Sequence, residues 1–150
     1  MIINGQNVLA IKVMYHKELY PDLMELESHG NFIDLRAAKN YDYKAGDSFL
    51  IDLGVSIELE EGYWAQIVPR SSTFTKYGII QTNSFGVIDN SYCGPDDIWK
   101  MPVYAIRDGS IKANDRVCQF RVVKDDPVII CSVETLTGKN RGGFGSTGNK

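Results

Sequence analysis

The stretch Asn83-Ser84-Phe85-Gly86-Val87-Ile88-Asp89-Asn90-Ser91-Tyr92-Cys93-Gly94 predicts an extended segment followed by a tight turn. Val87 and Ile88 favour an extended backbone, and Asp89-Asn90-Ser91 is a turn signal. We expect a β-hairpin or tight β-arch with Asp89 at the start of the turn and Tyr92 just past it. Such a structure offers backbone hydrogen-bonding groups, an aromatic face and a carboxylate, which suit a flat heterocycle, a sugar and a water nucleophile. In isolation, an ordinary surface hairpin with Asp89 capping its own turn is the simpler interpretation.

The rest of the chain predicts an all-β fold. Short apolar runs separated by Gly- and Asp-containing turns are typical of a β-sandwich or barrel. A short helix opening at Pro21, with Leu23, Met24 and Leu26 facing inward, is the only helix expected before residue 69. The expected strands cover residues 8–15, 49–53, 55–59, 63–68, 99–106, 115–123 and 128–136.

Composition limits the protein class. A chain of 150 residues with 43% hydrophobic residues predicts one domain with a sizeable core. The net charge of −3 argues against a nucleic-acid partner. No apolar run is long enough to span a membrane, and the N-terminus lacks the pattern of a signal peptide. We interpret Cys93, Cys118 and Cys131 as reduced thiols in a cytoplasm, two of them in core strands. His16, at the end of the first strand, and His29 are isolated, so no zinc site is predicted.

Pro69-Arg70-Ser71-Ser72-Thr73 ends a strand and can begin a helical turn. An Arg beside two hydroxyls at such a terminus is a plausible phosphate cradle, although a Ser N-cap with a surface Arg explains the stretch equally well. Arg116 and Gln119, in the strand expected at 115–123, are near enough in sequence to serve one site, but either could be a surface group.

The C-terminal stretch 139–150 is rich in Gly and cannot pack a core of its own. We therefore predict a barrel domain at 1–138 and a flexible arm at 139–150. Gly-rich backbone with Ser, Thr and Arg can wrap a polyphosphate through amide and hydroxyl donors. Phe144, a lone aromatic in this arm, is explained by stacking on a base.

Five stretches together resemble the five ordered motifs of the homotrimeric dUTPase family, the deoxyuridine triphosphate nucleotidohydrolases. Each motif is weak alone, but all five occur in order between residues 31 and 148. They are Ile33-Asp34-Leu35-Arg36-Ala37-Ala38, Pro69-Arg70-Ser71-Ser72, Gly86-Val87-Ile88-Asp89-Asn90-Ser91-Tyr92-Cys93-Gly94, Asp115-Arg116-Val117-Cys118-Gln119 and Arg141-Gly142-Gly143-Phe144-Gly145-Ser146-Thr147-Gly148.

The resemblance implies a jelly-roll-like β-barrel that assembles as a trimer, with each active site built from three subunits and closed by the tail of one. It implies hydrolysis of dUTP to dUMP and pyrophosphate, with magnesium held mainly by substrate phosphates and water. Such a reaction limits uracil incorporation into DNA and supplies dUMP for dTTP synthesis.

The third motif would hold the reacting and recognising groups. The resemblance assigns Asp89 to orienting and deprotonating the water that attacks the α-phosphorus. Tyr92 would lie under the deoxyribose and exclude a 2′-hydroxyl. Asn83 and the backbone would pair with the uracil edge, and the tight hairpin would exclude a 5-methyl group. The backbone positions are Gly86, Val87 and Ile88.

The other motifs would bind the phosphates and cap the base. Phe144 is the expected cap, and Asp34 is a partner of Arg70 or of metal-bound water, with a structural role equally open. The expected phosphate-binding residues are Arg70, Ser71, Ser72, Gln119, Arg141, Gly143, Ser146 and Thr147.

Two departures from the family pattern affect these assignments. Phe32 and Ile33 stand where the first motif usually has small residues. Gly94-Pro95-Asp96-Asp97 replaces the common Gly-Glu, which resembles the branch from Gram-positive bacteria and their prophages. In that branch an aromatic after the third motif can cap the base, so Trp99 competes with Phe144, although we favour packing for Trp99.

Two alternatives remain open from sequence. A dCTP deaminase shares the barrel and a Ser-rich second motif, but does not typically carry the Arg141–Gly148 tail. A regulatory protein-binding role, known for some phage members of the family, would use the segment 17–30 and would coexist with catalysis.

Overall fold

The computed structural model describes residues 1–144 and residue 147. The regular structure is almost entirely β, as predicted, and its strands pair antiparallel. The largest sheet has five strands in the order β11-β9-β14-β5-β4. Its members are β4 (Ser28–His29), β5 (Phe32–Arg36), β9 (Tyr63–Pro69), β11 (Gly86–Ile88) and β14 (Arg116–Lys124).

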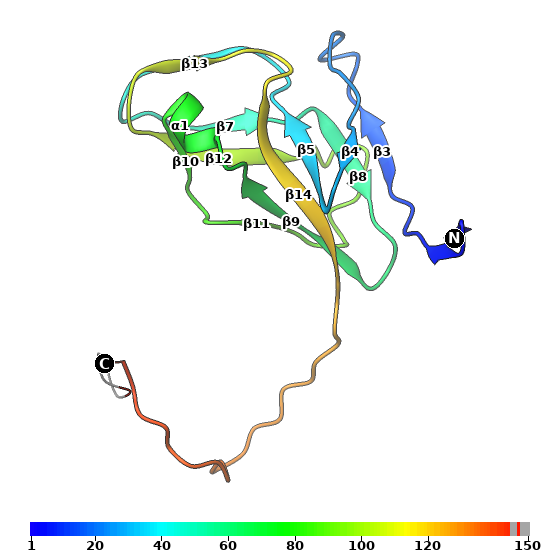
Figure 1. Cartoon of the computed structure of the whole chain (residues 1–150), viewed down its shortest axis with the longest axis vertical. Helices are drawn as coiled ribbons and strands as arrows, with labels where there is room; N and C mark the ends of the chain where they lie inside the picture. The colour runs from blue at the N-terminus through cyan, green and yellow to red at the C-terminus, as the bar shows by residue number, and fades with distance from the viewer. Residues whose placement is uncertain (145–146, 148–150) are drawn as a thin grey trace.

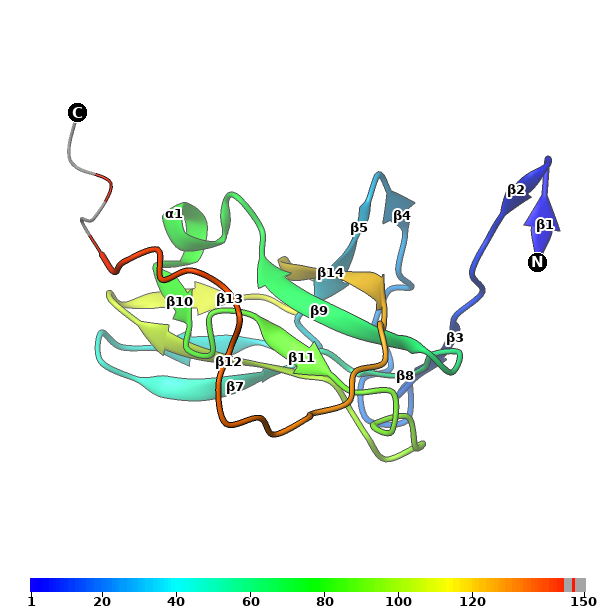
Figure 2. The same cartoon turned by 90° about the horizontal axis from the view of Figure 1, so that it is seen from below.

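Smaller sheets complete the fold, and all of them except the β1–β2 pair, which projects from the rest of the molecule, help to enclose one core (Figures 1 and 2). A three-stranded sheet has the order β10-β12-β7, and three two-stranded sheets pair β3 with β8, β6 with β13, and β1 with β2. The remaining elements are β1 (Ile2–Ile3), β2 (Gln6–Asn7), β3 (Lys12–Tyr15), β6 (Tyr41–Tyr43), β7 (Ser48–Asp52), β8 (Val55–Glu58), β10 (Ile79–Gln81), β12 (Lys100–Ala105), β13 (Gly109–Ile111) and the helix α1 (Thr73–Tyr77).

Strand alternation builds the core. In β12, Met101, Val103 and Ala105 are buried at every second position, because successive side chains point to opposite faces. Trp99, immediately before β12, is fully buried and packs edge-on against Phe120 of β14, with ring centroids 5.1 Å apart. These contacts tie the three-stranded sheet to the five-stranded sheet across the interior.

Several local predictions were wrong. The expected helix at Pro21 is absent. The chain turns there instead, because the backbone N–H groups of Leu19 and Tyr20 both bond to the carbonyl of His16. Leu23 is buried as expected, but Met24 is exposed. His16 is buried rather than a polar strand end, and contacts Ser56 Oγ at 2.9 Å and Glu18 Oε1 at 3.2 Å.

The last predicted strand, at 128–136, is also absent. The chain leaves the barrel after Lys124 at the end of β14 and runs away from it (Figure 1). Val128, Ile129 and Ile130 are each more than 80% exposed, with Ile130 at 96%. Their β-branched pattern has no strand of the same chain to pair with, so the apolar signal does not produce a ladder here.

The cysteine prediction was half right. All three thiols are free, but only Cys118 lies in the core, while Cys93 and Cys131 are exposed. Burial raises the pKa of the Cys118 thiol well above its usual range, so this thiol stays protonated and acts as a small core residue. No helix among the described residues has the length and apolar character needed to cross a membrane.

Candidate active site

The third-motif stretch forms a β-arch. β11 pairs with β9, with Gly86 opposite Ile67 and Ile88 opposite Ala65. After the turn the chain does not return along β11; it crosses to β12 in the three-stranded sheet. Gly86 favours this close pairing, because a Cβ there would lie only 3.1 Å from the Cβ of Ile67 and would force a small shift. The arch therefore exposes Asp89 and Tyr92 beyond the end of a short, well-anchored strand.

Asp89 caps its own turn. Its Oδ1 accepts hydrogen bonds from the Ser91 hydroxyl at 2.5 Å and from the Ser91 backbone N–H at 2.8 Å. The Ser91 hydroxyl and then its N–H lower the pKa of the Asp89 carboxyl from its ordinary value, so the group is ionised at neutral pH. A carboxylate has about four acceptor sites. Capping therefore leaves Asp89, which is exposed, able to accept a further proton-bearing group.

A hollow of about 450 Å³ lies beside the arch. The Tyr92 hydroxyl donates to the backbone carbonyl of Ile98 at 3.2 Å, which fixes the ring at the edge of this space. Its lining residues are Val87, Ile88, Asp89, Ser91, Tyr92, Ile98 and Lys100. A neighbouring hollow of about 540 Å³ also borders Val87 and Asp89, but Glu61 and Asp125 line it as well. These acidic groups disfavour a triphosphate, so we place the candidate base and sugar site in the first hollow.

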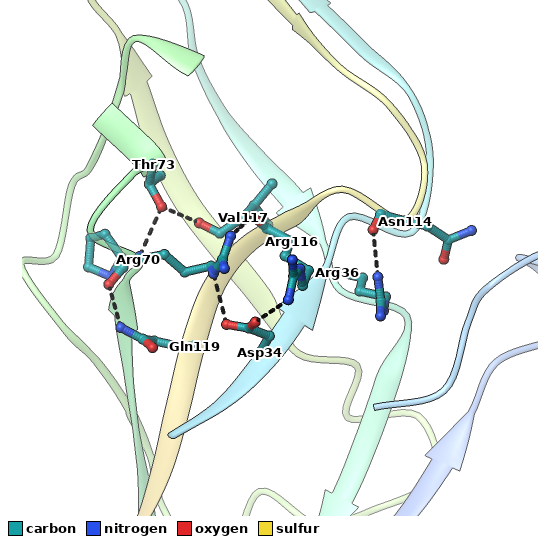
Figure 3. A network of polar contacts seen from close by, with 9 residues as sticks. Asp34, Arg36, Arg70, Thr73, Asn114, Arg116, Val117 and Gln119 are labelled. Atoms are coloured by element: carbon teal, nitrogen blue, oxygen red, sulfur yellow. Dashed lines mark hydrogen bonds and ion pairs between the residues drawn. The ribbon is translucent and has the colours of Figure 1, made fainter. Parts of the chain in front are cut away.

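A second cluster of predicted residues gathers around Asp34 (Figure 3). Asp34 Oδ1 pairs with Arg70 Nε at 2.8 Å, which is one of the alternatives left open from sequence, and its Oδ2 pairs with an Arg116 guanidinium nitrogen at 3.1 Å. One carboxylate between two guanidinium groups leaves a net positive charge. The Asp34 side chain is 20% exposed and that of Arg70 is 26% exposed, so an anion can still reach the cluster.

The strand end at Pro69 is held from both sides. The Gln119 amide donates to the carbonyl of Pro69 at 3.1 Å, and the backbone N–H of Arg70 donates to the Thr73 hydroxyl at 2.9 Å. The Thr73 hydroxyl in turn donates to the carbonyl of Val117 at 2.9 Å. Ser72 occupies the N-cap position of α1 but makes no capping side-chain bond. The Ser71 and Ser72 side chains are exposed, so they can reach an incoming anion.

The two clusters lie apart within one chain. Ile88, next to Asp89, is opposite Ala65, whereas Arg70 follows the far end of β9. Five residues of strand separate Ala65 from Arg70, roughly 17 Å at about 3.3 Å per residue. A single chain therefore does not bring the candidate base and the candidate phosphate residues around one phosphorus atom.

The C-terminal arm lies far from both clusters (Figure 1). Arg141, Gly143 and Thr147 are exposed, and Phe144 is fully exposed at 113%. Ser146, expected to bind phosphate, lies outside the described residues. Trp99, the competing base cap, is 0% exposed. In this structure Trp99 is a core residue, and Phe144 is the accessible aromatic of the two.

The part of the chain that the structure describes shows no carboxylate cage for a metal ion. Within residues 1–144 and at 147, no three His, Cys, Asp or Glu side chains converge on a common point. Both oxygens of Asp34 already face guanidinium groups. This donor set fits magnesium only as an ion held mainly by substrate oxygens and water.

Sequence reasoning missed three supporting residues. Arg116 was left open as a surface group, and Thr73 and Ser91 received no role. The sequence did contain a signal that Arg116 could pair with Asp34. The first and fourth motifs each contain a strand, and opposite charges on paired strands attract each other. The bonds of Thr73 and Ser91 depend on local backbone geometry that residue types do not reveal.

Comparison with known proteins agrees with the fold. The dUTPase family model matches residues 27–148. A prophage-derived deoxyuridine 5'-triphosphate nucleotidohydrolase of Bacillus subtilis is 48% identical over 143 residues, covering 95% of this chain and 100% of the relative. A deoxyuridine 5'-triphosphate nucleotidohydrolase of Nautilia profundicola is 34% identical, covering 93% of this chain and 98% of the relative.

Solved structures share the fold. A dUTPase of Staphylococcus bacteriophage 80alpha, determined with dUpNHpp, superposes with a TM-score of 0.77 at 17% identity, covering 93% of this chain and 98% of that one. The Streptococcus mutans dUTPase superposes with a TM-score of 0.65 at 23% identity, covering 79% and 98%. The strand arrangement thus places the protein in the all-β class that has the dUTPase fold. Within that class, the chain belongs to the dUTPase family.

Proposed function

We propose that this chain hydrolyses dUTP to dUMP and pyrophosphate, with Asp89 activating the attacking water. The reaction follows from family membership and the assignment of Asp89 from its position in the third motif. The observation that supports Asp89 most directly is its hydrogen-bonded, ionised carboxylate at the rim of the hollow beside Tyr92. As a base, Asp89 would hold the water in line with the α-phosphorus and take its proton.

The arch would select the base and the sugar. Tyr92, fixed through Ile98, would lie under the deoxyribose, where a 2′-hydroxyl would meet the ring. The uracil edge would pair with the Asn83 side chain and with backbone groups of Gly86, Val87 and Ile88. Because β11 is already paired with β9, these backbone groups are held in place before substrate arrives.

The triphosphate would bind at the positive cluster. Arg70, oriented by Asp34, would offer guanidinium protons, and Gln119, Ser71 and Ser72 would offer amide and hydroxyl donors. Magnesium bound to the triphosphate would neutralise phosphate charge during the displacement. A solved dUTPase from phage phi11 of S. aureus coordinates a structural Mg(II) ion, which supports magnesium as the metal here.

The separation of the two clusters supports a trimer with shared sites. Since Asp89 and Arg70 lie roughly 17 Å apart along β9, each site would take the arch of one subunit and the phosphate cluster of another. The exposed arm would close over the site, with Phe144 on the base and Arg141, Gly143, Ser146 and Thr147 on the phosphates. This closure would exclude water and complete the donor set.

We place the reaction in the cytoplasm, where it would remove dUTP from the nucleotide pool. The relatives and solved structures reported above are dUTPases and not dCTP deaminases. Solved Staphylococcus bacteriophage 80alpha dUTPases are described as controlling transfer of virulence genes. By analogy, the irregular surface segment 17–30 is the place on this chain for a regulatory partner.

The first experiment is pyrophosphate release with magnesium from dUTP, dCTP, dTTP and UTP in parallel. We expect rapid release from dUTP and little from the other three. Ammonia release from dCTP would indicate a deaminase, and no reaction with any nucleotide would contradict the proposed activity.

The assignment of Asp89 is tested with Asp89→Asn. The amide keeps the acceptor for Ser91 but cannot take a proton, so we expect turnover to fall by about 10²- to 10⁴-fold. Binding of dUTP, measured by calorimetry, should persist. Near-normal turnover would reject Asp89 as the base. Asp97→Asn, in the loop that follows the arch, is the control and should retain activity.

A further inference from the structure

Gln81 is a buried polar residue behind the arch. It is the last residue of β10, and its side chain is almost entirely enclosed, at 4% exposure. Its Nε2 donates to the backbone carbonyl of Ile67 at 3.2 Å and to the Asn83 side-chain oxygen at 2.9 Å. Gln81 therefore links β9 to the residue expected to pair with the uracil edge.

These two bonds fix the orientation of both amides. The carbonyl of Ile67 can only accept, so the Gln81 NH₂ group must face it. The second proton of that NH₂ group then points at Asn83, where only the Oδ1 side can accept. The Asn83 Nδ2 group is left on the opposite side of its amide, away from Gln81. The Ile67 carbonyl thus sets the orientation of the buried Gln81 amide. The Gln81 amide in turn sets the orientation of the exposed Asn83 amide.

The Gln81 side chain is not explained by packing. Its Oε1 atom is buried and has no hydrogen-bond partner among the described residues. An unpaired buried oxygen destabilises a fold, and an apolar side chain of equal size would avoid that cost. Gly86 lies beside it, since a Cβ on Gly86 would be 3.7 Å from Gln81 Nε2. The amide is therefore placed at the inner face of the arch, where its effect on Asn83 is direct.

We propose that Gln81 is a specificity-determining positioning residue that makes Asn83 present a donor to the 4 position of the base. Uracil carries a carbonyl acceptor at that position, and cytosine carries an amino donor. When Gln81 holds the Asn83 amide in one orientation, the Asn83 NH₂ group donates to the uracil carbonyl but faces the amino group of cytosine, which is also a donor. An unlocked Asn83 amide can flip and offer Oδ1 to cytosine. This inference rests on the proposed function, because it assumes that Asn83 faces the base.

The test compares discrimination between dUTP and dCTP in Gln81→Met and in wild type. Methionine fills a similar volume but cannot donate to Asn83. We expect the ratio of kcat/KM for dUTP to that for dCTP to fall about tenfold, mainly through KM. In Gln81→Glu the carboxylate would accept from Asn83 and favour the flipped amide, so the ratio should fall further. Gln66→Met, which removes an amide from β9, is the matched control and should keep the ratio.

Two further measurements separate positioning from stability. In an Asn83→Ala background, Gln81→Met should leave the ratio unchanged, because no amide remains to orient. An unchanged ratio in Gln81→Met with a lower melting temperature would overturn the proposal and make Gln81 structural. Should Gln81→Met fail to fold, an unchanged ratio in Gln81→Glu would overturn it equally. If wild type does not hydrolyse dUTP, the proposed function fails, which is a distinct result.

Discussion

At the scale of single residues, Asp89 carries two tasks at once. The hydrogen bonds from Ser91 to the Asp89 carboxylate agree with the simplest interpretation of residues 83–94, in which Asp89 caps its own turn. The same bonds hold the carboxylate in one orientation and lower its pKa. A turn cap and a catalytic base are therefore compatible in this protein, because the cap preorganises the group that would meet the water.

Ser91→Ala tests this coupling. The hydroxyl is the largest contribution to the lowered pKa of Asp89, so its removal should raise that pKa towards the ordinary value. A base works only when deprotonated, so the acid limb of the kcat/KM profile should move to higher pH. The plateau at high pH should fall much less than in Asp89→Asn. An acid limb that stays in place would show that Asp89 does not control it; Ser84→Ala is the control.

The neighbourhood of Asp34 was only partly predictable. Arg70 was one of the partners left open for Asp34, and the structure shows an ion pair between the two side chains. The second guanidinium, from Arg116, was not assigned, because its distance from Asp34 depends on the register between β5 and β14. That register contains an irregularity between Arg116 and Cys118, which no residue pattern indicates.

At the scale of elements, the longer strands were predicted well, whereas the paired strands β5, β6, β10 and β13 were not among the expected ones. β7, β8, β9, β12 and β14 all fall on expected segments, because their alternation matches a half-buried sheet. The segment 128–136 shows the same kind of pattern and forms no strand, leaving Val128 and Ile130 exposed. Alternation of apolar residues indicates that a segment can form a strand if a neighbouring strand is present. It does not indicate whether the same chain supplies that neighbouring strand.

Deleting residues 139–150 tests the arm as a lid. None of the arm residues that the structure describes, 139–144 and 147, belongs to the barrel core, so the melting temperature should stay close to that of the full chain. Turnover of dUTP should fall by about 10²-fold or more, because the closing donors and the base cap are lost. Phe144→Ala is the narrower variant and should raise KM. A fully active truncated protein would refute the lid.

At the scale of the whole molecule, one chain does not bring together all the residues of the proposed site. The arch and the phosphate cluster sit at opposite ends of β9, and the arm extends away from both (Figure 1). Rigid pairing of β9 with β14 along seven positions prevents the two clusters from approaching each other. Association of several copies is the simplest way to bring them around one substrate.

Complementation between inactive variants tests the shared site. Asp89→Asn lacks the base and Arg70→Ala lacks a phosphate ligand, so each alone should be nearly inactive. After unfolding and refolding together in equal amounts, about a quarter of the sites in random trimers should combine an intact Asp89 with an intact Arg70. Pyrophosphate release should recover to about that fraction of wild type. No recovery, with mixed trimers verified by mass spectrometry, would place both residues in the same subunit's site.

The sequence by itself determined the family and the all-β class, because motifs record residue types and strand alternation records burial. It also named Arg70 as one of the open partners for Asp34, and the two side chains form an ion pair in the structure. The tertiary structure alone decided that the third motif is an arch, that Trp99 is a core residue, and that Gln81 orients Asn83. It also separated Asp89 from Arg70. Each of these depends on strand register and on contacts between distant segments, which are set by packing of the whole chain rather than by any local pattern.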